Sequence, residues 1–363
     1  MTELLLDVRD LRVDFRLPNG VLHAVDGASF ELPAGEALGI VGESGAGKTM
    51  ALRALVGLLP RAATLAGGEI VFEGVDLAAA SPETLRAVRG RSIAMIFQEP
   101  MTALNPVMRV GEQIAEGPLV RLGYSRRRAH ARALELMRLV GIPDPEERAE
   151  AYAHELSGGM RQRVMIAIAL SMEPKLILCD EPTTALDVTI QDQILKLLAS
   201  LRERLGVSVV FVSHDLAVIA QTCRRVAVMY AGQVVETGPV ERVFREPRHP
   251  YTLGLLRSVP DVDDRRDVLL TIPGAPPDLA DPPSGCRFHP RCRYMTDICR
   301  QAEPPLVDYG RGHLAACHHP LNVDRETLER VRVSKRQTPG SADEAPRPQE
   351  PGKEGARPIP RSG

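Results

Sequence analysis

The chain has 363 residues, which is enough for two or three domains and a sizeable core. Its 45 basic and 47 acidic residues nearly cancel, which argues against nucleic acid or an acidic membrane surface as the main partner. Aromatic residues make up only 4% of the chain and Trp is absent, which argues against a stacking surface for single-stranded nucleic acid.

The amino-terminal stretch "MTELLLDVRDLRVDF" contains acidic residues and no long apolar core, so it does not have the pattern of a secretory signal. The longest apolar runs, at 164–170 and 207–212, are much shorter than the roughly 20 residues that span a bilayer. We therefore expect a cytoplasmic or peripheral protein, in which disulfides are rare. Cys179 and Cys223 stand alone in apolar surroundings and are expected to be small buried side chains.

The first pattern along the chain is "EALGIVGESGAGKTMALRALVGLL" at 36–59, which predicts a strand, a glycine-rich loop and a helix. Residues 101–156 differ because they combine helix formers with many charges and few β-branched residues, which predicts a helical insertion. We interpret the arginine run at 126–128 as a solvated helix face in preference to an anion site.

Two short apolar runs, at 175–182 and 207–215, each end in charged residues and predict buried parallel strands. Between them, apolar residues recur at spacings of three and four and predict an amphipathic helix over 188–205. Strands joined by such long crossovers predict a mostly parallel sheet. Residues 224–238 then predict a hairpin that turns at Ala231 and Gly232.

The stretch "GESGAGKT" at 42–49, here called the P-loop, fits the pattern G-x4-G-K-[ST]. Its glycines let backbone N–H groups approach phosphates, and the helix that follows adds a favourable dipole. Lys48 is expected to reach the β- and γ-phosphates, and Thr49 to hold Mg²⁺. The candidate phosphate-binding residues are therefore Gly42, Ser44, Gly45, Gly47, Lys48 and Thr49.

The apolar run "LILCDEP" ends in two adjacent carboxylates, Asp180 and Glu181. Two acids at the end of a buried strand are costly unless a cation or protons compensate their charge. Asp180 suits Mg²⁺, and Glu181 is placed to polarise an attacking water, although an ordinary strand exit can also carry this pair. Gln98 and His214 follow other strand-like runs, and Ser157 starts a helix where it can serve as an N-cap.

Together these features resemble the ATP-binding subunits of ABC transporters over about residues 4–320. The order along the chain matches that family: P-loop, Gln98, "LSGG" at 156–159, "DEP", "ALD" at 185–187, and His214. The resemblance implies an α/β ABC ATPase fold, that is, a P-loop NTPase core with a helical insertion. It implies ATP and Mg²⁺ as ligands.

The domain boundaries follow from the same resemblance and the composition. Residues 1–100 and 157–245 are expected to form a RecA-like core with an antiparallel β part, and 101–156 a helical subdomain. Proline and glycine multiply from 246 onward, so we expect a loop-rich C-terminal extension over 246–333. Residues 334–363 have almost no apolar content and are expected to be disordered.

The resemblance also implies a head-to-tail pair of subunits that traps two ATP molecules. Ser157, Gly158 and Gly159 are then expected to contact the γ-phosphate bound by the partner, and Asp187 to lie in a loop that communicates across the dimer. One departure is visible: the family commonly has Gln after "LSGG", and this chain has Met160. A Met does not reproduce the hydrogen bonds of an amide, whereas the contacts expected from the backbone and Ser157 remain.

Within one subunit, the resemblance implies that Glu181 is the general base and His214 the sensor of the γ-phosphate. Gln98 is expected to help hold Mg²⁺ with Thr49 and Asp180, and to link the site to membrane subunits. An aromatic residue near the amino terminus stacks on adenine in this family. Phe15 is the candidate, with a core Phe on a strand as the alternative.

The stretch "FREPRHPYTLGLLRSVP" at 244–260, with "EPMTALNP" at 99–106, is similar to oligopeptide and dipeptide importer ATPases. The resemblance implies a second, homologous ATPase subunit, two membrane-spanning permease subunits and an extracytoplasmic peptide-binding protein, with this chain at the cytoplasmic face of the membrane. Nickel and glutathione importers share the pattern, so they stay open as alternatives. A soluble ABC ATPase of ribosomes or DNA is disfavoured by the single cassette and balanced charge.

Four cysteines near the end of the chain are separated by 5, 6 and 17 residues: Cys286, Cys292, Cys299 and Cys317. Structural zinc sites usually use close C-x2–4-C pairs, and none occurs here, although nearby histidines can supply nitrogen ligands. Four thiolates without tight pairs suit the larger cubane of a [4Fe–4S] cluster. The arrangement is similar to that of some peptide-importer ATPases with such a cluster. We expect a structural staple for a region poor in core, with a redox sensor as the alternative.

Overall fold

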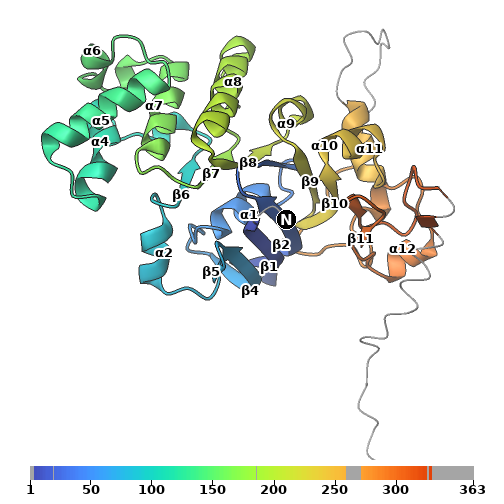
Figure 1. Ribbon diagram of the computed structural model, residues 1–363. Helices are drawn as coiled ribbons and strands as arrows, with labels where there is room; N and C mark the ends of the chain where they lie inside the picture. Colours follow the sequence, from blue (N-terminus) through green and yellow to red (C-terminus); the bar gives the residue numbers. More distant parts are fainter. Residues whose placement is uncertain (1–3, 19, 185, 259–270, 325–326, 329–363) are drawn as a thin grey trace, which may run out of the picture.

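The computed structural model describes residues 4–18, 20–184, 186–258, 271–324 and 327–328. The tail expected at 334–363 and Ala185 of the 185–187 motif lie outside these ranges. Figure 1 shows two β-sheets at the centre, helices α4 to α7 gathered on one side, and the C-terminal elements on the opposite side.

A four-stranded antiparallel sheet has the order β2-β1-β4-β5. Its strands are β1 (Leu4–Leu17), β2 (Gly20–Pro33), β4 (Ala63–Phe72) and β5 (Val75–Asp76). In β1, Leu6 and Val8 are buried at the two-residue period of a strand, and so are Leu11 and Val13. The phase changes between the two pairs because a bulge separates them, with Asp10 at a φ of 47°. The bulge keeps one face of a long strand on the core.

The second sheet has eight strands in the order β11-β12-β10-β9-β3-β8-β7-β6. Its parallel part consists of β9 (Arg225–Tyr230), β3 (Ala37–Val41), β8 (Ser208–Ser213), β7 (Leu176–Asp180) and β6 (Ile93–Ile96). The strands predicted at 175–182 and 207–215 are confirmed as β7 and β8, and every residue of both is buried. Such strands read as continuous apolar runs because helices cover both faces of a parallel sheet.

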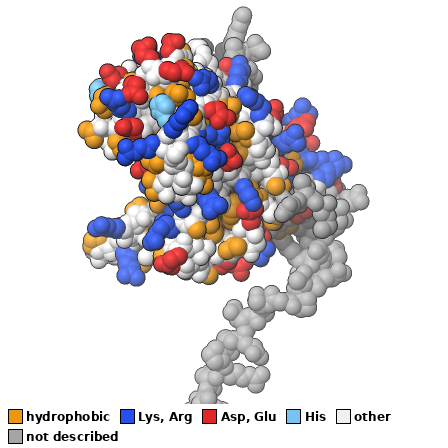
Figure 2. Space-filling view, turned by 60° about the vertical axis from the view of Figure 1, so that its left-hand side comes forward, with side chains coloured by type: hydrophobic (Ala, Val, Ile, Leu, Met, Phe, Trp, Pro, Cys, Tyr) orange, Lys and Arg blue, Asp and Glu red, His pale blue; other side chains and the backbone are white. Residues whose placement is uncertain are grey.

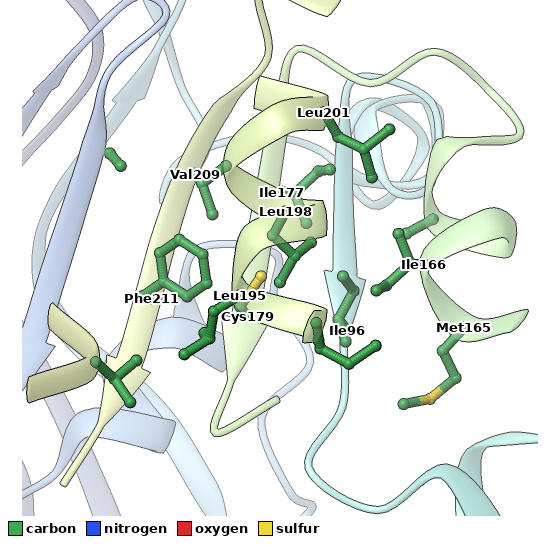
Figure 3. Packing of buried hydrophobic residues seen from close by; sticks show 14 of the residues in the cluster. Ile96, Met165, Ile166, Ile177, Cys179, Leu195, Leu198, Leu201, Val209 and Phe211 are labelled. Carbon is green, nitrogen blue, oxygen red and sulfur yellow. The ribbon is translucent and has the colours of Figure 1, made fainter. Parts of the chain in front are cut away.

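Helices cover the parallel strands: α1 (Lys48–Ala54), α7 (Gly158–Leu170), α8 (Val188–Leu205) and α9 (Leu216–Thr222). The helix predicted over 188–205 is confirmed as α8. Figure 3 shows Leu195, Leu198 and Leu201 of this helix packed over Ile177 and Val209 of β7 and β8. Each of these leucines is at most 3% exposed, so truncation of one to Ala is expected to cost about 2–5 kcal/mol.

Residues between β6 and α7 are helical. They form α3 (Pro100–Ala103), α4 (Val110–Arg121), α5 (Arg126–Leu139), α6 (Pro145–Ala149) and the short η1 (Ala153–Glu155), whereas α2 (Pro82–Val88) precedes β6. In α5 the buried residues recur at helical spacing, namely Ala129, Ala133, Leu136 and Met137. The arginines at 126–128 are exposed, and the guanidinium of Arg128 lies 3.7 Å from the ring centroid of Tyr124. They form the solvated face that the sequence indicates.

The predicted hairpin is confirmed as β9 and β10 (Gln233–Pro239), joined by Ala231 and Gly232 at φ values of 49° and 84°. Beyond it lie α10 (Val240–Arg245), α11 (Pro250–Ser258), η2 (His289–Arg291), α12 (Asp297–Gln301), β11 (Val307–Asp308) and β12 (Leu314–Ala315). The sequence predicts a loop-rich C-terminal extension, but part of this extension belongs to the main sheet, because β12 pairs with β10. Two-residue strands carry no periodic pattern, which is why the sequence does not predict them.

A buried carboxylate joins the extension to the main sheet. Glu236 of β10 is fully buried and accepts hydrogen bonds from the backbone N–H groups of Arg248 and His249, at 2.7 and 2.9 Å. Nε2 of His313 lies 2.7 Å from the same carboxylate. The guanidinium of Arg248 donates to the carbonyl of His313 at 3.3 Å. Two segments, one before α11 and one before β12, are therefore held by hydrogen bonds to a single buried side chain of β10.

The surface is mixed in charge on the face drawn in Figure 2, where Lys and Arg side chains alternate with Asp and Glu. Apolar side chains on this face are mostly scattered among them. Among the residues that the structure describes, no helix combines the length and the apolar character that crossing a membrane requires.

Candidate nucleotide-binding site

A cavity of about 770 Å³ opens at the carboxyl ends of β3, β7 and β8. Its size is typical of small-molecule sites, and the carboxyl edge of a parallel sheet is where α/β proteins bind ligands. Its walls come from four parts of the chain: the β1–β2 hairpin, the P-loop with the start of α1, the residues after β6, β7 and β8, and one residue of the C-terminal extension. Nine residues singled out from the sequence line it, namely Phe15, Ser44, Gly45, Gly47, Lys48, Thr49, Gln98, Glu181 and His214.

The P-loop packs so closely against its surroundings that two of its positions admit only glycine. A Cβ on Gly42 would lie 2.2 Å from the carbonyl oxygen of Met229, and one on Gly47 would lie 2.2 Å from that of Ala24. Gly47 also has a φ of 97°, which side chains rarely tolerate. These glycines hold the loop against the core, so its backbone N–H groups can face the cavity.

Lys48 begins α1 and is only 5% exposed. Its Nζ donates to the carbonyl oxygens of Gly42 and Glu43, at 2.9 and 3.0 Å. Burial lowers the pKa of Lys48, whereas the nearby carboxylates of Glu181, Asp180 and Glu43 act in the opposite direction. The ammonium is therefore held inside the loop, where phosphate oxygens would replace carbonyls as its acceptors.

Asp180 ends β7 and is 1% exposed. Thr49 Oγ1 donates to Oδ1 of Asp180 at 2.9 Å, and Oδ2 is buried without a hydrogen-bond partner. Burial raises the pKa of Asp180, and the hydrogen bond from Thr49 partly offsets the rise. A buried carboxylate with an unpartnered oxygen beside a hydroxyl is a donor set that fits Mg²⁺, which prefers oxygen ligands.

Glu181 brings two further candidates together. Its Oε2 lies 3.2 Å from Nδ1 of His214 and 3.5 Å from Nε2 of Gln98, and it accepts a hydrogen bond from Thr184 Oγ1 at 2.9 Å. The backbone of Glu181 has a φ of 46°, an uncommon value for a residue with a side chain. Strain of this kind is retained where the surrounding structure fixes the residue, and it often accompanies function.

A separate group consists of the residues at the starts of α7 and α8. Ser157 caps α7 by accepting from the N–H of Met160 at 3.3 Å, and Asp187 caps α8 by accepting from that of Ile190 at 3.0 Å. The two starts touch, because a Cβ on Gly159 would lie 2.7 Å from Ile190. Ser157, Gly158, Gly159 and Asp187 do not line the cavity. Met160 packs partly buried against the core.

The four cysteines of the extension lie in one region. The N–H of Cys286 donates to the carbonyl of Cys299 at 2.8 Å, and burial raises the pKa of Cys286 to about 11 and that of Cys317 to about 12. The other three thiols, including Cys292, contribute to the rise at Cys317. In the described parts of the chain, however, no three His, Cys, Asp or Glu side chains are grouped so that they could hold a metal ion. The iron–sulfur assignment stays a prediction.

Several residues at the site carry no recognisable signal in the sequence. Leu279 of the extension lines the cavity beside Leu22 of β2. Arg291 binds Glu43 of the P-loop with two hydrogen bonds, at 2.6 and 3.1 Å. The phenol oxygen of Tyr251 accepts a hydrogen bond from the N–H of Glu43 at 2.8 Å. These residues are isolated in a region rich in proline, so no motif indicates them.

Two family models match the chain. A model of the ABC transporter family matches residues 25–184. A second model, described as the C-terminal region of oligopeptide/dipeptide transporters, matches residues 235–299. The first match contains the P-loop and the β7 carboxylates, and the second contains the start of the extension and three of its four cysteines.

Curated relatives match nearly the whole chain. It is 50% identical over 317 residues to a probable peptide ABC transporter ATP-binding protein of Sinorhizobium fredii, covering 87% of this chain and 95% of the relative. It is 48% identical to the oligopeptide transport ATP-binding protein OppD of Bacillus subtilis, over 92% and 94% of the two chains. It is 46% identical to the dipeptide transport ATP-binding protein DppD of Haemophilus influenzae, over 90% and 98%.

Solved structures match the cassette. The dimeric ATP-binding cassette MJ0796, in a post-hydrolysis state with ADP and Pi, has a TM-score of 0.59 and 26% identity, covering 65% of this chain and 98% of that one. CbiO1 from Clostridium perfringens has a TM-score of 0.57 and 28% identity, over 67% and 91%. The fold is therefore that of an ABC ATPase cassette. The chain belongs to the family of ABC transporter ATP-binding proteins, in its oligopeptide/dipeptide branch, and it is an ATPase coupled to transport.

Proposed function

We propose that this chain is the ATP-hydrolysing subunit of an importer for dipeptides or oligopeptides at the cytoplasmic face of the cell membrane. The observation that carries the solute class is the match of the extension to the C-terminal region of oligopeptide/dipeptide transporters. Relatives named for peptide transport, at 46–50% identity over about nine-tenths of the chain, support it. ATP binding closes the dimer, closure drives the membrane subunits, and hydrolysis then resets the dimer.

The phosphates of ATP lie on the P-loop, and the base lies between the loop and Phe15. Lys48 exchanges its present acceptors, the carbonyls of Gly42 and Glu43, for phosphate oxygens. Ser44, Gly45, Gly47 and Thr49 supply N–H groups at the start of α1, where the helix dipole favours an anion. The carrying observation is that these residues and Phe15 line one cavity.

Thr49 and Asp180, with Gln98, are the residues that would hold Mg²⁺. When bound, this ion neutralises charge on the phosphate oxygens. The unpartnered, buried Oδ2 of Asp180 supports the assignment, because a carboxylate buried without a cation is costly.

Glu181 is the general base of hydrolysis. Its carboxylate takes a proton from water as the water oxygen bonds to the γ-phosphorus, and the bond from that phosphorus to the bridging oxygen of ADP breaks. His214, 3.2 Å from the Glu181 carboxylate, lies where it can donate to the γ-phosphate once nucleotide is bound. Gln98 reports the state of the site to the membrane subunits. The convergence of His214 and Gln98 on one oxygen of Glu181 supports the roles.

A second subunit completes the site. Ser157, Gly158, Gly159 and Asp187 lie outside the cavity of their own chain, yet they form a second cluster with a helix start that suits an anion. A head-to-tail dimer brings this cluster onto the partner's γ-phosphate. The partner is a homologous, different ATPase subunit, and the assembly includes two permease subunits and an extracytoplasmic peptide-binding protein.

Uptake measurements test the solute. A strain that lacks this gene is complemented with the wild-type chain or with Glu181→Gln, and uptake of a radiolabelled dipeptide is measured. We expect the wild-type chain to restore uptake and the variant to fail. Nickel and glutathione uptake are measured in the same strains. If the strain that lacks the gene keeps peptide uptake but loses nickel or glutathione uptake, the peptide proposal is replaced by a nickel or glutathione importer.

The cysteines of the extension hold a [4Fe–4S] cluster that stabilises the fold of this region. The residues fit in identity and number, because four thiols that affect one another electrostatically provide Cys₄ ligation. The spacing of the cysteines, without close C-x2–4-C pairs, favours a cluster over a structural zinc ion. Cys286, Cys292, Cys299 and Cys317 would hold the cluster, and their bonds to it would cross-link this region.

Iron and sulfide analysis tests this. The chain purified without oxygen is expected to contain iron and sulfide at about four of each per chain, as a [4Fe–4S] cluster requires, and Cys286→Ser is expected to lose them together with protection from protease over the extension. Cys223→Ser, a buried core thiol, is the control and should retain both. Stoichiometric zinc in the wild type, or full iron in Cys286→Ser, would contradict the assignment.

A further inference from the structure

The C-terminal extension reaches the nucleotide cavity. Leu279 is partly buried and lines the cavity together with Phe15, Leu17 and Leu22 of the β1–β2 hairpin. Phe15 and Leu22 face each other across the hairpin, and the N–H of the next residue, His23, donates to the carbonyl of Leu279 at 3.4 Å. An element more than 200 positions away in the chain thus adds an apolar side chain to the hairpin's wall of the cavity.

Local hydrogen bonds shape the segment around Leu279. The Asp278 carboxylate accepts from the N–H of Ala280 at 2.9 Å, and the carbonyl of Asp278 accepts from the N–H of Asp281 at 3.3 Å. Such a turn is typical of Asp, whose short side chain bonds to the backbone two residues further on. It leaves Leu279 at the turn, beside the cavity.

Arg291 braces the same segment against the P-loop. Its Nε donates to the carbonyl of Pro273 at 2.9 Å, and its two terminal nitrogens donate to both oxygens of Glu43, at 2.6 and 3.1 Å. The Arg291 side chain is only 5% exposed. A two-fold hydrogen bond between a guanidinium and a carboxylate fixes both distance and orientation. One buried side chain therefore joins the proline-rich segment to the loop that binds phosphate.

The cavity separates by chemistry into two parts. Lys48, Thr49, Glu181 and His214 are polar and suit phosphates, whereas the hairpin residues and Leu279 are apolar. A purine ring has two flat faces and gains most when apolar surface covers both. We propose that Leu279 contacts the nucleobase and that Arg291 is a positioning residue that holds the Leu279 segment on the P-loop. This inference rests on the proposed nucleotide site and makes the extension part of it.

Binding of two ligands to the full chain tests the role of Leu279. Mg-ATP carries a base, and inorganic tripolyphosphate carries only the phosphates. Replacing Leu by Ala removes apolar contact with the base, so Leu279→Ala is expected to weaken ATP binding about 5- to 30-fold. Tripolyphosphate binding should not change. Leu306→Ala, a partly buried leucine of the extension that does not line this cavity, is the control.

The outcomes separate the inference from the site itself. Equal weakening of both ligands by Leu279→Ala would mean that the side chain acts through the fold of the P-loop, and unchanged ATP affinity would mean no contact; either result overturns the proposal. Leu279→Met should restore most of the ATP affinity. If the wild-type chain bound neither ligand, the nucleotide site would be wrong, and not only the role of Leu279.

Arg291 has its own test. Arg291→Met is expected to weaken both ATP and tripolyphosphate, because it frees Glu43 in the P-loop as well as the Leu279 segment. Glu43→Gln weakens the same ion pair from the other side, and it keeps the measurement informative if Arg291→Met does not fold. Arg293→Met, an exposed arginine two positions away, is the control and should bind both ligands normally. Normal ATP affinity in both Arg291→Met and Glu43→Gln would overturn the bracing role.

Discussion

Buried carboxylates occur both at the nucleotide site and beneath the C-terminal extension, and their surroundings differ. Asp180 has one hydrogen bond, from Thr49, and its second oxygen is buried without a partner. Glu236 is equally buried but is surrounded by two backbone N–H groups and His313. Burial raises the pKa of Asp180, so folding works against its charge. A buried charge with few partners indicates a place for a ligand, whereas one with several indicates a structural joint.

The largest effect is expected at the catalytic side of this comparison. Glu181→Gln removes the proposed base and should lower ATP turnover about 100- to 10,000-fold, because that is the usual contribution of general-base catalysis. ATP binding should persist, and the variant should accumulate a closed dimer with its partner. Phosphate release, equilibrium ATP binding and gel filtration measure the three properties.

Glu203→Gln is the control for this substitution, since its side chain is 71% exposed and far from the cavity lining. It should hydrolyse ATP as the wild type does. Wild-type turnover in Glu181→Gln would remove the base assignment.

The next largest effect is expected at Glu236, the carboxylate that holds the C-terminal extension to the main sheet. Glu236→Gln replaces one acceptor oxygen by an NH₂ group that faces the N–H donor of either Arg248 or His249, so the free energy of unfolding should fall by about 2–4 kcal/mol. Urea unfolding and limited proteolysis of the extension measure it. Glu241→Gln, at a side chain of α10 that is 71% exposed, should be neutral.

Asp180→Asn makes the same kind of change, from carboxylate to amide, at the proposed Mg²⁺ ligand. It therefore tests whether Asp180 and Glu236 contribute differently to stability. It should not lower the stability of the free protein, and should raise it by up to about 1 kcal/mol, since a charge that folding disfavours is removed. If both substitutions destabilise the protein equally, the distinction between the two carboxylates is wrong.

A smaller effect is expected for phosphate binding. Lys48→Ala should weaken ATP binding about 10- to 100-fold, because hydrogen bonds between charged groups contribute about 1.5–3 kcal/mol. Isothermal titration with Mg-ATP measures the affinity. Lys196→Ala, whose side chain is 69% exposed, should bind normally. Unchanged affinity in Lys48→Ala would refute the P-loop assignment.

The smallest effect is a pH dependence of the free energy of unfolding, which arises from His249 beside Glu236. Burial lowers the pKa of His249 to about 3, so its ring stays neutral in the folded chain while the unfolded chain takes up a proton below about pH 6.5. Stability is therefore fully present above pH 6.5 and declines below it, by at most about 1.4 kcal/mol per pH unit from this group. His249→Gln should flatten the decline between pH 6.5 and 4.5 relative to the exposed His154→Gln. Parallel curves for the two variants would contradict this account.

The sequence predicts the ATPase fold well because its core elements have clear periods. The strand at 176–180 is a continuous apolar run, and the helix at 188–205 shows one apolar face. The P-loop is recognisable because phosphate binding requires several special residues at fixed spacing. Physical constraints that act locally are therefore visible in a single chain.

The extension is harder to predict because long-range contacts determine it. Strands β11 and β12 have two residues each, too few to show alternation. Leu279 lies beside the cavity because Asp278 forms a turn and because Arg291 joins Pro273 of the same segment to Glu43 of the P-loop. One available clue is Glu236, the ionisable residue of strand β10, whose burial demands partners from elsewhere.

The pairing of β12 with β10 also has a consequence for biosynthesis. Strand β10 ends at Pro239, and its partner begins only at Leu314, 75 positions later. At a synthesis rate of about 5–20 residues per second, the ribosome needs roughly 4–15 s to make the partner. During that time the edge of a nearly complete sheet is open to other chains, which is the usual route to aggregation. Codon choice and chaperone access over this stretch of the message should therefore influence the yield of folded protein.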